Sequence, residues 1–235
     1  FMHINGHDYL FDENGVMQIG WQFDGKSWYY FGTSGAMKTG WQSINGTWYY
    51  FDKNGVMQTG WQSIGGSWYW FNGSGAMQTG WLSLNGTWYW FNNSGAMVTG
   101  WQYIGNAWYY FGGSGAMKTG WLNLGGAWYY LNGSGAMATG WTKVGGSWYW
   151  FNGSGSMQTG WLQLDGTWYW LSSSGTMVTG WQQVGGTWYY FYGSGAMAQS
   201  CWVGDYYLTS SGAMATNQRI DGWWVGADGK WVAGA

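Results

Sequence analysis

Residues 60–79 read Gly-Trp-Gln-Ser-Ile-Gly-Gly-Ser-Trp-Tyr-Trp-Phe-Asn-Gly-Ser-Gly-Ala-Met-Gln-Thr, and nearly all of the remaining chain is a copy of this stretch. The copies recur every 20 residues, and each holds one Trp directly after a Gly and a second Trp seven residues later. Full copies of this unit fill residues 21–200. A fixed period of this length is typical of repeat architectures, in which each unit buries its apolar surface against its neighbours.

The two ends of the chain depart from this pattern. Residues 1–20 form a degenerate first repeat, in which Phe1 and Asp8 stand where the two Trp residues are expected. Residues 201–235 hold contracted repeats, which we expect to form a C-terminal cap without the paired Trp residues. Between them, residues 21–200 make up nine full repeats.

Each unit predicts a β-hairpin. Pairs such as Asn45-Gly46 and Gly65-Gly66 suit two-residue hairpin turns, and strand-favouring aromatic and aliphatic residues flank them. A turn at Gly65-Gly66 pairs residue 64 with 67, 63 with 68, 62 with 69 and 61 with 70. Because cross-strand partners share a face, Trp61, Trp68 and Trp70 should lie on one face, with Ile64, Tyr69 and Phe71 on the other. We expect Ile64 and Phe71 to be interior, since their equivalents are aliphatic or Phe throughout. The fold class is therefore all-β: a repeat β-solenoid of stacked two-stranded hairpins.

The composition excludes several classes of protein. Aromatic residues make up 23% of the chain and charged residues 7%, with 46 Gly and no Pro. The net charge of −2 gives no electrostatic surface for nucleic acid or an anionic membrane. No apolar run approaches the roughly 20 residues of a membrane span. The single cysteine, Cys201, permits no disulfide framework. Because the chain begins at Phe1 and shows no signal peptide, we expect a segment of a longer, exported protein.

We expect this segment to have no enzymatic activity and to need no metal or cofactor. The nine acidic residues stand singly in turns or near the ends, apart from Asp12 and Glu13. Those two are adjacent, so in an extended chain their side chains point apart. His3 and His7 have no third ligand in view for a metal. A catalytic domain of the full protein would lie outside this sequence.

The aromatic face carries the functional prediction. One interpretation is that the rings are simply the core, since each buries about 150 to 250 Å². The opposite face already supplies an aliphatic, a Tyr and a Phe or Leu for packing, which leaves the Trp-rich face without a partner in the chain. Where rings from adjacent units converge, they can form cages that bind quaternary ammonium groups by cation–π attraction.

The repeat Gly-Trp-x-x-aliphatic-x-Gly-Ser/Thr-Trp-Tyr-Tyr/Trp-Phe/Leu-x-x-x-Gly-x-Met-x-Thr resembles the cell-wall-binding repeat of choline-binding proteins from Gram-positive bacteria and their phages. The match is strongest from Gly20 to Met197. The resemblance implies hairpins stacked into a left-handed β-solenoid, with choline held between consecutive units by rings from both. It implies a module that is secreted, lies at the bacterial cell surface, binds phosphocholine on teichoic acid and anchors a larger surface or lytic protein.

Carried over onto this sequence, each site would take the two Trp of one unit and the third aromatic of the Trp-Tyr-aromatic run in the next. Met37, Met57, Met77 and their equivalents would close each pocket or pack beneath the loop. The predicted sites are Trp21, Trp28 and Tyr50; Trp41, Trp48 and Trp70; Trp61, Trp68 and Trp90; Trp81, Trp88 and Tyr110; Trp101, Trp108 and Tyr130; Trp121, Trp128 and Trp150; Trp141, Trp148 and Trp170; Trp161, Trp168 and Tyr190; and Trp181, Trp188 and Tyr207.

Two other functions remain open at this stage. Related repeats in glucosyltransferases and clostridial toxins bind glucans or cell-surface sugars, on which aromatic rings also stack. The Trp at position 68 and its equivalents favours choline, since that position is commonly polar or basic in the glycan-binding repeats. A structural stalk with fully self-packed rings would bind no small ligand. Homodimerisation through the C-terminal cap is also left open.

Overall fold

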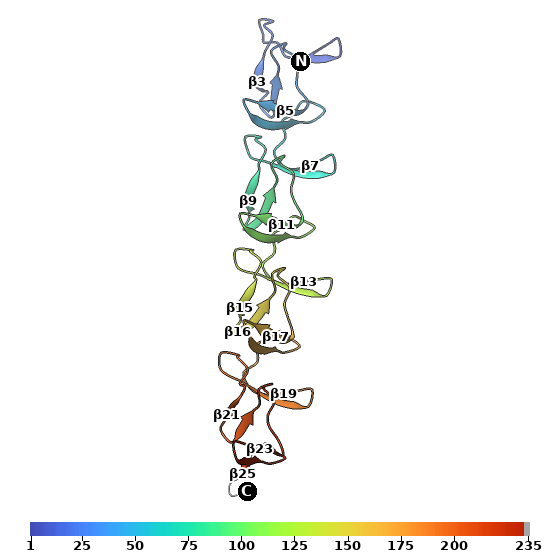
Figure 1. The fold of residues 1–235 in the computed structure, drawn as a ribbon. Helices are drawn as coiled ribbons and strands as arrows, with labels where there is room; N and C mark the ends of the chain where they lie inside the picture. The colour runs from blue at the N-terminus through green and yellow to red at the C-terminus, as the bar shows by residue number, and fades with distance from the viewer. Residues whose placement is uncertain (233–235) are drawn as a thin grey trace. The chain divides into compact units, whose positions relative to one another are not determined.

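The computed structural model describes residues 1–232, and its regular secondary structure there consists of β-strands alone. The strands pair two by two in chain order, β1 with β2, β3 with β4 and so on, and a loop leads from each antiparallel hairpin to the following one (Figure 1). The chain divides into two compact units, Phe1–Lys118 and Thr119–Ala235. The predicted all-β fold of repeated two-stranded hairpins is confirmed, and the left-handed sense of the solenoid stays a prediction.

The first unit holds strands β1 to β12. Their bounds are β1 Met2–Ile4, β2 His7–Tyr9, β3 Gly20–Phe23, β4 Trp28–Phe31, β5 Gly40–Ile44, β6 Thr47–Phe51, β7 Gly60–Ile64, β8 Ser67–Phe71, β9 Gly80–Leu84, β10 Thr87–Phe91, β11 Gly100–Ile104 and β12 Ala107–Phe111.

The second unit holds strands β13 to β25. Their bounds are β13 Gly120–Leu124, β14 Ala127–Leu131, β15 Gly140–Val144, β16 Ser147–Phe151, β17 Gly160–Leu164, β18 Thr167–Leu171, β19 Gly180–Val184, β20 Thr187–Phe191, β21 Cys201–Val203, β22 Tyr206–Leu208, β23 Gln218–Ile220, β24 Trp223–Val225 and β25 Trp231–Val232.

The hairpin register is the predicted one. In β7 and β8, Trp61 lies opposite Trp70, and Ile64 lies opposite Ser67 across the two-residue turn. Asn45, at the first turn position of the β5–β6 hairpin, has φ of 51° and is followed by Gly46 at 79°. Positive φ at both central positions defines the type I′ turn, whose twist matches that of the flanking strands. The turn residues therefore fix which side chains share a face.

The core consists of large side chains, one from each full repeat. Phe71 and its equivalents in the other full units have 0% exposed surface. The predicted interior position of Ile64 holds less strictly, since Ile44 is 8% exposed but Ile64 itself is only half-buried. In the part of the chain that the structure describes, no polar or charged residue is buried.

The loop after each hairpin is ordered by short-range hydrogen bonds. In the β8–β9 loop, the Asn72 side-chain oxygen accepts bonds from the backbone N–H groups of Ser74 and Ala76, both at 3.0 Å. Gly75 follows with φ of +78°, and a Cβ on it would overlap the side chain of Met57. Glycine is needed here for its positive φ and for the close approach of the methionine.

The two ends carry shorter hairpins, as the sequence indicates. Strands β1 and β2 pair over three positions, and so do β21 and β22. Strands β23, β24 and β25 form a small three-stranded sheet. The division into residues 1–20, 21–200 and 201–235 remains a sequence-based interpretation, and residues 233–235 lie outside the described range. Within residues 1–232 there is no helix with the length and apolar character needed to cross a membrane.

Candidate aromatic cages

Successive hairpins meet through opposite faces. The Trp41 ring, on one face of the β5–β6 hairpin, lies with its centroid 4.8 Å from that of Tyr69 in β8, at an interplanar angle of 68°. It also lies 5.6 Å from Phe71, the core residue of that next hairpin. The Trp-rich face of one hairpin therefore packs on the Tyr and Phe face of the hairpin that follows.

An open cavity lies at this junction. Trp41 and Trp48 of one hairpin are 6.3 Å apart at 81°, so their rings form two walls nearly at right angles. Tyr69 and Met77 complete the lining from the next unit, and Asn93 and Ser94 lie at its edge. The volume is about 380 Å³. We call such a set a cage and name it after its first Trp.

The Trp61 cage repeats this construction one hairpin further along. Trp61, Trp68, Tyr89 and Met97 line a cavity of about 430 Å³, with Gly113 and Ser114 of a following loop at its edge. Neither of these two cavities has a charged side chain in its lining. The aromatic faces are therefore the main source of negative potential available to a cation inside.

The same Trp–Tyr pairing recurs within each of the two compact units, Phe1–Lys118 and Thr119–Ala235. In the first unit the first Trp and the Tyr of the next hairpin are 4.8 to 5.1 Å apart at Trp21–Tyr49, Trp41–Tyr69, Trp61–Tyr89 and Trp81–Tyr109. In the second unit the distances are 4.8 to 5.0 Å at Trp121–Tyr149, Trp141–Tyr169, Trp161–Tyr189 and Trp181–Tyr206.

A backbone hydrogen bond fixes the methionine in each cage. The Met77 N–H donates to the Trp48 carbonyl at 2.8 Å, which ties the loop of one unit to the hairpin before it. Equivalent bonds of 2.7 or 2.8 Å join Met57 to Trp28, Met97 to Trp68, Met117 to Trp88, Met157 to Trp128, Met177 to Trp148, Met197 to Trp168 and Met214 to Trp188. The methionines both line the cages and pack on loop glycines, so both sequence-based interpretations of these residues apply.

The third ring differs from the one predicted from the sequence. The predicted partners each lie instead against the first Trp of their own hairpin, with centroids 5.0 to 5.3 Å apart. They are Tyr50, Trp70, Trp90, Tyr110, Tyr130, Trp150, Trp170, Tyr190 and Tyr207. The ring that joins the two Trp residues of the preceding hairpin is the Tyr one position earlier. The predicted site of Trp101, Trp108 and Tyr130 stays a prediction, because Trp101 and Trp108 belong to the first compact unit and Tyr130 to the second.

Stacking in one direction explains this difference. Cross-strand partners share a face, so Trp70 shares the face of Trp61, whereas Tyr69 lies on the opposite face. When hairpins stack head to tail, the Trp face of one must meet the opposite face of the next. The sequence pattern contained this signal, because the alternation of faces already placed Tyr69 beside Phe71.

The second Trp of each cage is held open to solvent. Trp28, Trp48, Trp68 and Trp88 are 44 to 48% exposed, whereas the core Phe residues are fully buried. Trp108, Trp128, Trp148 and Trp188 are also exposed, and Trp168 is half-buried. Rings in a purely structural core would be covered, so these Trp side chains are available to a ligand.

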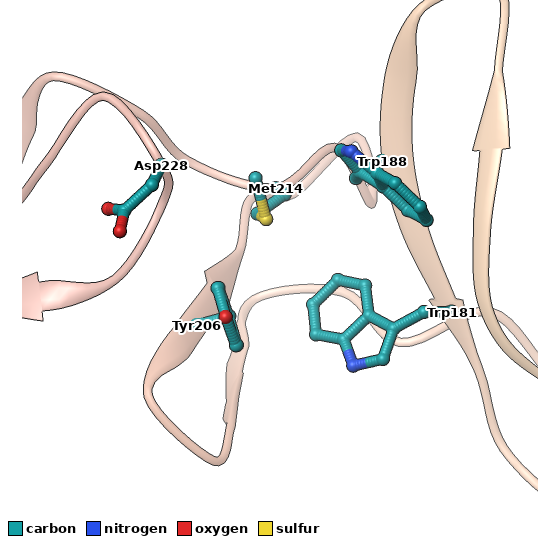
Figure 2. Close-up of a pocket in the computed structure, with 5 residues that line it drawn as sticks. All are labelled: Trp181, Trp188, Tyr206, Met214 and Asp228. Carbon is teal, nitrogen blue, oxygen red and sulfur yellow. The ribbon is translucent and has the colours of Figure 1, made fainter.

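Figure 2 shows the cage nearest the C-terminus among the regular repeats. Trp181 and Trp188 of the β19–β20 hairpin face Tyr206 and Met214 across the cavity. Asp228 lies at the edge, beyond Met214, with its carboxylate turned away from the rings in this view. One oxygen of that carboxylate accepts the Lys230 N–H at 3.0 Å.

Shifted pKa values occur beside the regular cages. The Asp24 carboxyl accepts the N–H groups of Ser27 and Lys26, which lowers its pKa. Desolvation, followed by its hydrogen bond to Asp24 at 3.1 Å, raises the pKa of Tyr29. A 3.4 Å contact with the Cys201 sulfur raises the pKa of Tyr192. At the N-terminal end, His3 pairs with Asp8 at 2.7 Å, and residues 1–232 contain no cluster of three metal-ligating side chains.

Comparison with known proteins gives consistent matches along the chain. Family models described as a choline-binding repeat match residues 1–39, 38–62, 58–99, 98–139 and 138–179, and another matches 196–231. A putative cell wall binding repeat matches residues 179–197. No curated protein sequence gives a significant match.

Solved structures of pneumococcal proteins resemble this fold. CbpJ from Streptococcus pneumoniae TIGR4 is 37% identical with a TM-score of 0.79, and 99% of each chain is covered. Choline-binding protein F from Streptococcus pneumoniae, solved in the presence of a peptidoglycan analogue, is 33% identical with a TM-score of 0.75, over 98% of this chain and all of that one. The choline-binding domain of CbpL from the same species is 35% identical with a TM-score of 0.59, over 74% of this chain and 97% of that one. The chain belongs to the choline-binding repeat family.

Proposed function

We propose that this chain is a non-catalytic cell-wall-binding module that holds the trimethylammonium group of choline in its aromatic cages. One observation carries the proposal: two exposed or half-buried Trp rings, a Tyr and a Met surround an open, uncharged cavity between consecutive hairpins. An arrangement of this kind attracts a cation through the negative faces of the rings. It also offers a quaternary ammonium the apolar contacts that its methyl groups require.

The lining favours a quaternary ammonium over one that carries N–H groups. A primary ammonium loses hydrogen bonds to water when it enters a cavity, and only an acceptor inside can replace them. The Trp41 and Trp61 cages have no carboxylate in their lining. Choline has no N–H to leave unpaired, so it enters at a smaller desolvation cost.

Several weak sites acting together supply useful affinity. An exposed cation–π contact contributes roughly 0.5 to 1 kcal/mol, rising to about 2 kcal/mol when water is excluded. Each of the two compact units contains four cages. A cell-wall polymer that carries choline at regular intervals would engage many of them at once. Linked binding of this kind raises avidity by about 10² to 10⁴ without new contacts.

The natural ligand that fits best is phosphocholine on teichoic acid. Only seven Lys and Arg residues occur in the chain, so the phosphate receives little help and the trimethylammonium end must provide most of the binding. The related choline-binding protein F has been solved in the presence of a peptidoglycan analogue, which supports a role at the cell wall. In this proposal the module anchors a larger secreted protein at the bacterial surface.

Titration with four ligands tests the proposal. Tryptophan fluorescence would be followed on adding choline chloride, tetramethylammonium, 3,3-dimethylbutan-1-ol and dextran. We expect saturable changes with both quaternary cations and much weaker ones with the butanol, which has the shape of choline without its charge. Equal responses to choline and the butanol would rule out cation–π recognition. A response to dextran alone would identify a glycan-binding surface, and silence with all four would favour a structural stalk.

A further inference from the structure

An additional cavity lies at the C-terminal end, outside the regular repeats. Trp202 of β21, Trp223 of β24 and Trp231 of β25 line it together with Gly204 and Asp205 of the β21–β22 turn. Its volume is about 240 Å³, and the three Trp side chains are 38, 53 and 40% exposed. Trp223 and Trp231 lie 5.5 Å apart at 75°, as neighbouring walls do in the regular cages. The sequence pattern assigned this region to a cap, because the paired Trp residues are missing.

Trp202 is equivalent to Trp181, the first Trp of a regular cage. Trp202 lies opposite Tyr207 in the β21–β22 hairpin, as Trp181 lies opposite Tyr190 in β19 and β20. The ring centroids are 5.2 Å apart in both pairs, at angles of 62° and 65°. Trp202 is therefore the first Trp of a further cage.

A backbone hydrogen bond that recurs between repeats identifies the residues equivalent to the second Trp and to the methionine of a regular cage. In the Trp181 cage, the Met214 N–H donates to the Trp188 carbonyl at 2.8 Å. In the C-terminal cavity, the Trp231 N–H donates to the Asp205 carbonyl at the same distance. Asp205 thus stands in the place of the second Trp, and Trp231 stands in the place of the methionine.

The spacing to the core residue identifies the side chain equivalent to the cage Tyr. Tyr206 precedes the fully buried Leu208 by two positions, and Trp223 precedes the fully buried Val225 by two positions. Trp223 therefore takes the place of the cage Tyr. We call the set of Trp202, Asp205, Trp223 and Trp231 the C-terminal cage. It has three Trp walls, and its remaining member, Asp205, carries a carboxylate.

The carboxylate changes what this cage can bind. Within residues 1–232 the Asp205 side chain has no hydrogen-bond partner, and the His3–Asp8 contact is the only ion pair there. A carboxylate is an acceptor with several lone pairs, and an ammonium that retains an N–H can donate a short, charge-assisted hydrogen bond to it. A quaternary ammonium has no hydrogen to donate, and its methyl groups would cover the carboxylate without satisfying it.

We propose that the C-terminal cage binds an organic ammonium group that retains at least one N–H, in preference to a quaternary one. The cation–π walls are those of the proposed choline cages, so this inference rests on the proposed function, while the unpartnered Asp205 carboxylate reverses the selectivity in this cage. Primary, secondary and tertiary ammonium groups share the chemistry required. The regular cages would then bind quaternary ammonium groups, and the C-terminal cage would bind ammonium groups that retain an N–H.

The probes for this proposal are choline, N,N-dimethylethanolamine and ethanolamine, added to the intact chain near neutral pH. The readout is the indole ¹H–¹⁵N signals of Trp231 and of Trp48, whose cage has no carboxylate in its lining. The two signals are assigned with W231F and W48F. At Trp231 we expect dimethylethanolamine to reach its midpoint at about fivefold lower concentration than choline, since hydrogen bonds to charged groups exceed neutral ones in strength. At Trp48 we expect the opposite order.

Two variants make the test specific. D205N keeps the shape of the turn but removes the charge, and it should abolish the preference at Trp231 without changing Trp48. D221N, in the exposed turn of the β23–β24 hairpin, is the matched control and should change neither signal. A preference that survives in D205N would overturn the role of the carboxylate.

The outcomes at the two reporters separate this proposal from the proposed function. Choline shifting Trp231 at the same concentration as dimethylethanolamine, or no ammonium shifting Trp231 at all, would overturn the C-terminal site. In either case a normal choline response at Trp48 would support the choline cages. The absence of any response at Trp48, combined with the expected order at Trp231, would refute the regular cages and retain the C-terminal one.

Discussion

The ring centroid of Trp41 lies 4.8 Å from that of Tyr69, a residue of the next hairpin, with the two planes at 68°. This contact joins the Trp face of one hairpin to the opposite face of its neighbour. It recurs at the same spacing in both units, for example between Trp121 and Tyr149. Each cage therefore belongs to two consecutive hairpins, and neither hairpin can form it alone.

Replacing Tyr69 should weaken one cage. Y69A removes a wall of the Trp41 cage, and we expect the choline midpoint at the Trp48 indole signal to rise about 2- to 30-fold, from roughly 0.5 to 2 kcal/mol per ring. The signals of other cages, such as Trp128 in the second unit, should be unchanged. Indole NMR titration measures both in one sample.

W70Y is the matched control for this variant. Tyr occupies the equivalent position at Tyr50, and Trp70 lies against Trp61 of its own hairpin, not against Trp41. We expect W70Y to leave the Trp48 midpoint unchanged. A large effect of W70Y with none from Y69A would restore the site originally predicted from the sequence.

The hairpin register could be predicted from the sequence because the turn pairs determine it. Once Gly65-Gly66 is placed in a two-residue turn, every cross-strand partner from residue 60 to 71 follows, and the structure has the same pairs. The burial of Phe71 follows from the same alternation. The same alternation places Tyr69 on the face opposite Trp61. Which face of the next hairpin meets the Trp face depends on the direction of stacking, and it is there that the sequence prediction chose Trp70 in place of Tyr69.

Substituting Gly75 should destabilise the array. G75A forces an L-residue to φ of +78° and drives its Cβ into the Met57 side chain. We expect a loss of about 1 to 3 kcal/mol in the free energy of unfolding, seen as a lower urea midpoint. G73A, two residues away in open space, should have little effect because Asn93 and Lys53 already occupy the equivalent position. Equal midpoints for the two variants would contradict this account of the loop.

Lys143 places a cation beside Trp148, the second Trp of the Trp141 cage. Its Nζ lies 6.0 Å from the Trp148 ring, at a position where Ser43 and Ser63 stand in other units. The lysine competes with a ligand for that ring, so K143S should lower the choline midpoint at Trp148 by about two- to fivefold, from roughly 0.5 to 1 kcal/mol at an exposed site. K26S, in the β3–β4 turn, is the control for a general change in charge. An increase in the midpoint of K143S would contradict the competition.

Asp24 should titrate below an ordinary aspartate. The N–H groups of Ser27 and Lys26 stabilise the ionised carboxylate, so its pKa in the folded chain lies below the usual 3.8. Its contribution to stability is complete above 3.8 and is lost as the pH falls through the lower folded-state pKa. The pH dependence of the Ser27 amide signal reports this titration directly. A midpoint at or above 3.8 would contradict the hydrogen-bonded turn, and D24N should abolish the titration.

The C-terminal cage was hidden from sequence reasoning by the contraction of its hairpin. Loss of residues from the β21–β22 hairpin shifts every spacing, so Asp205 and Trp231 no longer fall at the positions of a Trp and a Met. The signal in the sequence was the pair Trp202 and Tyr207. A two-residue turn at Gly204-Asp205 places them opposite each other, as Trp181 and Tyr190 are in the longer hairpin. Only the backbone bond from Trp231 to Asp205 shows which residues are equivalent.

A crystal structure of the chain with choline tests the central claim most directly. The account predicts the trimethylammonium nitrogen inside the Trp41 cage, within about 6 Å of the ring centroids of Trp41, Trp48 and Tyr69, with Met77 against its methyl groups. The same position should be occupied in the Trp61 cage. Choline bound against Trp70, or cages that remain empty at saturating choline, would contradict the account.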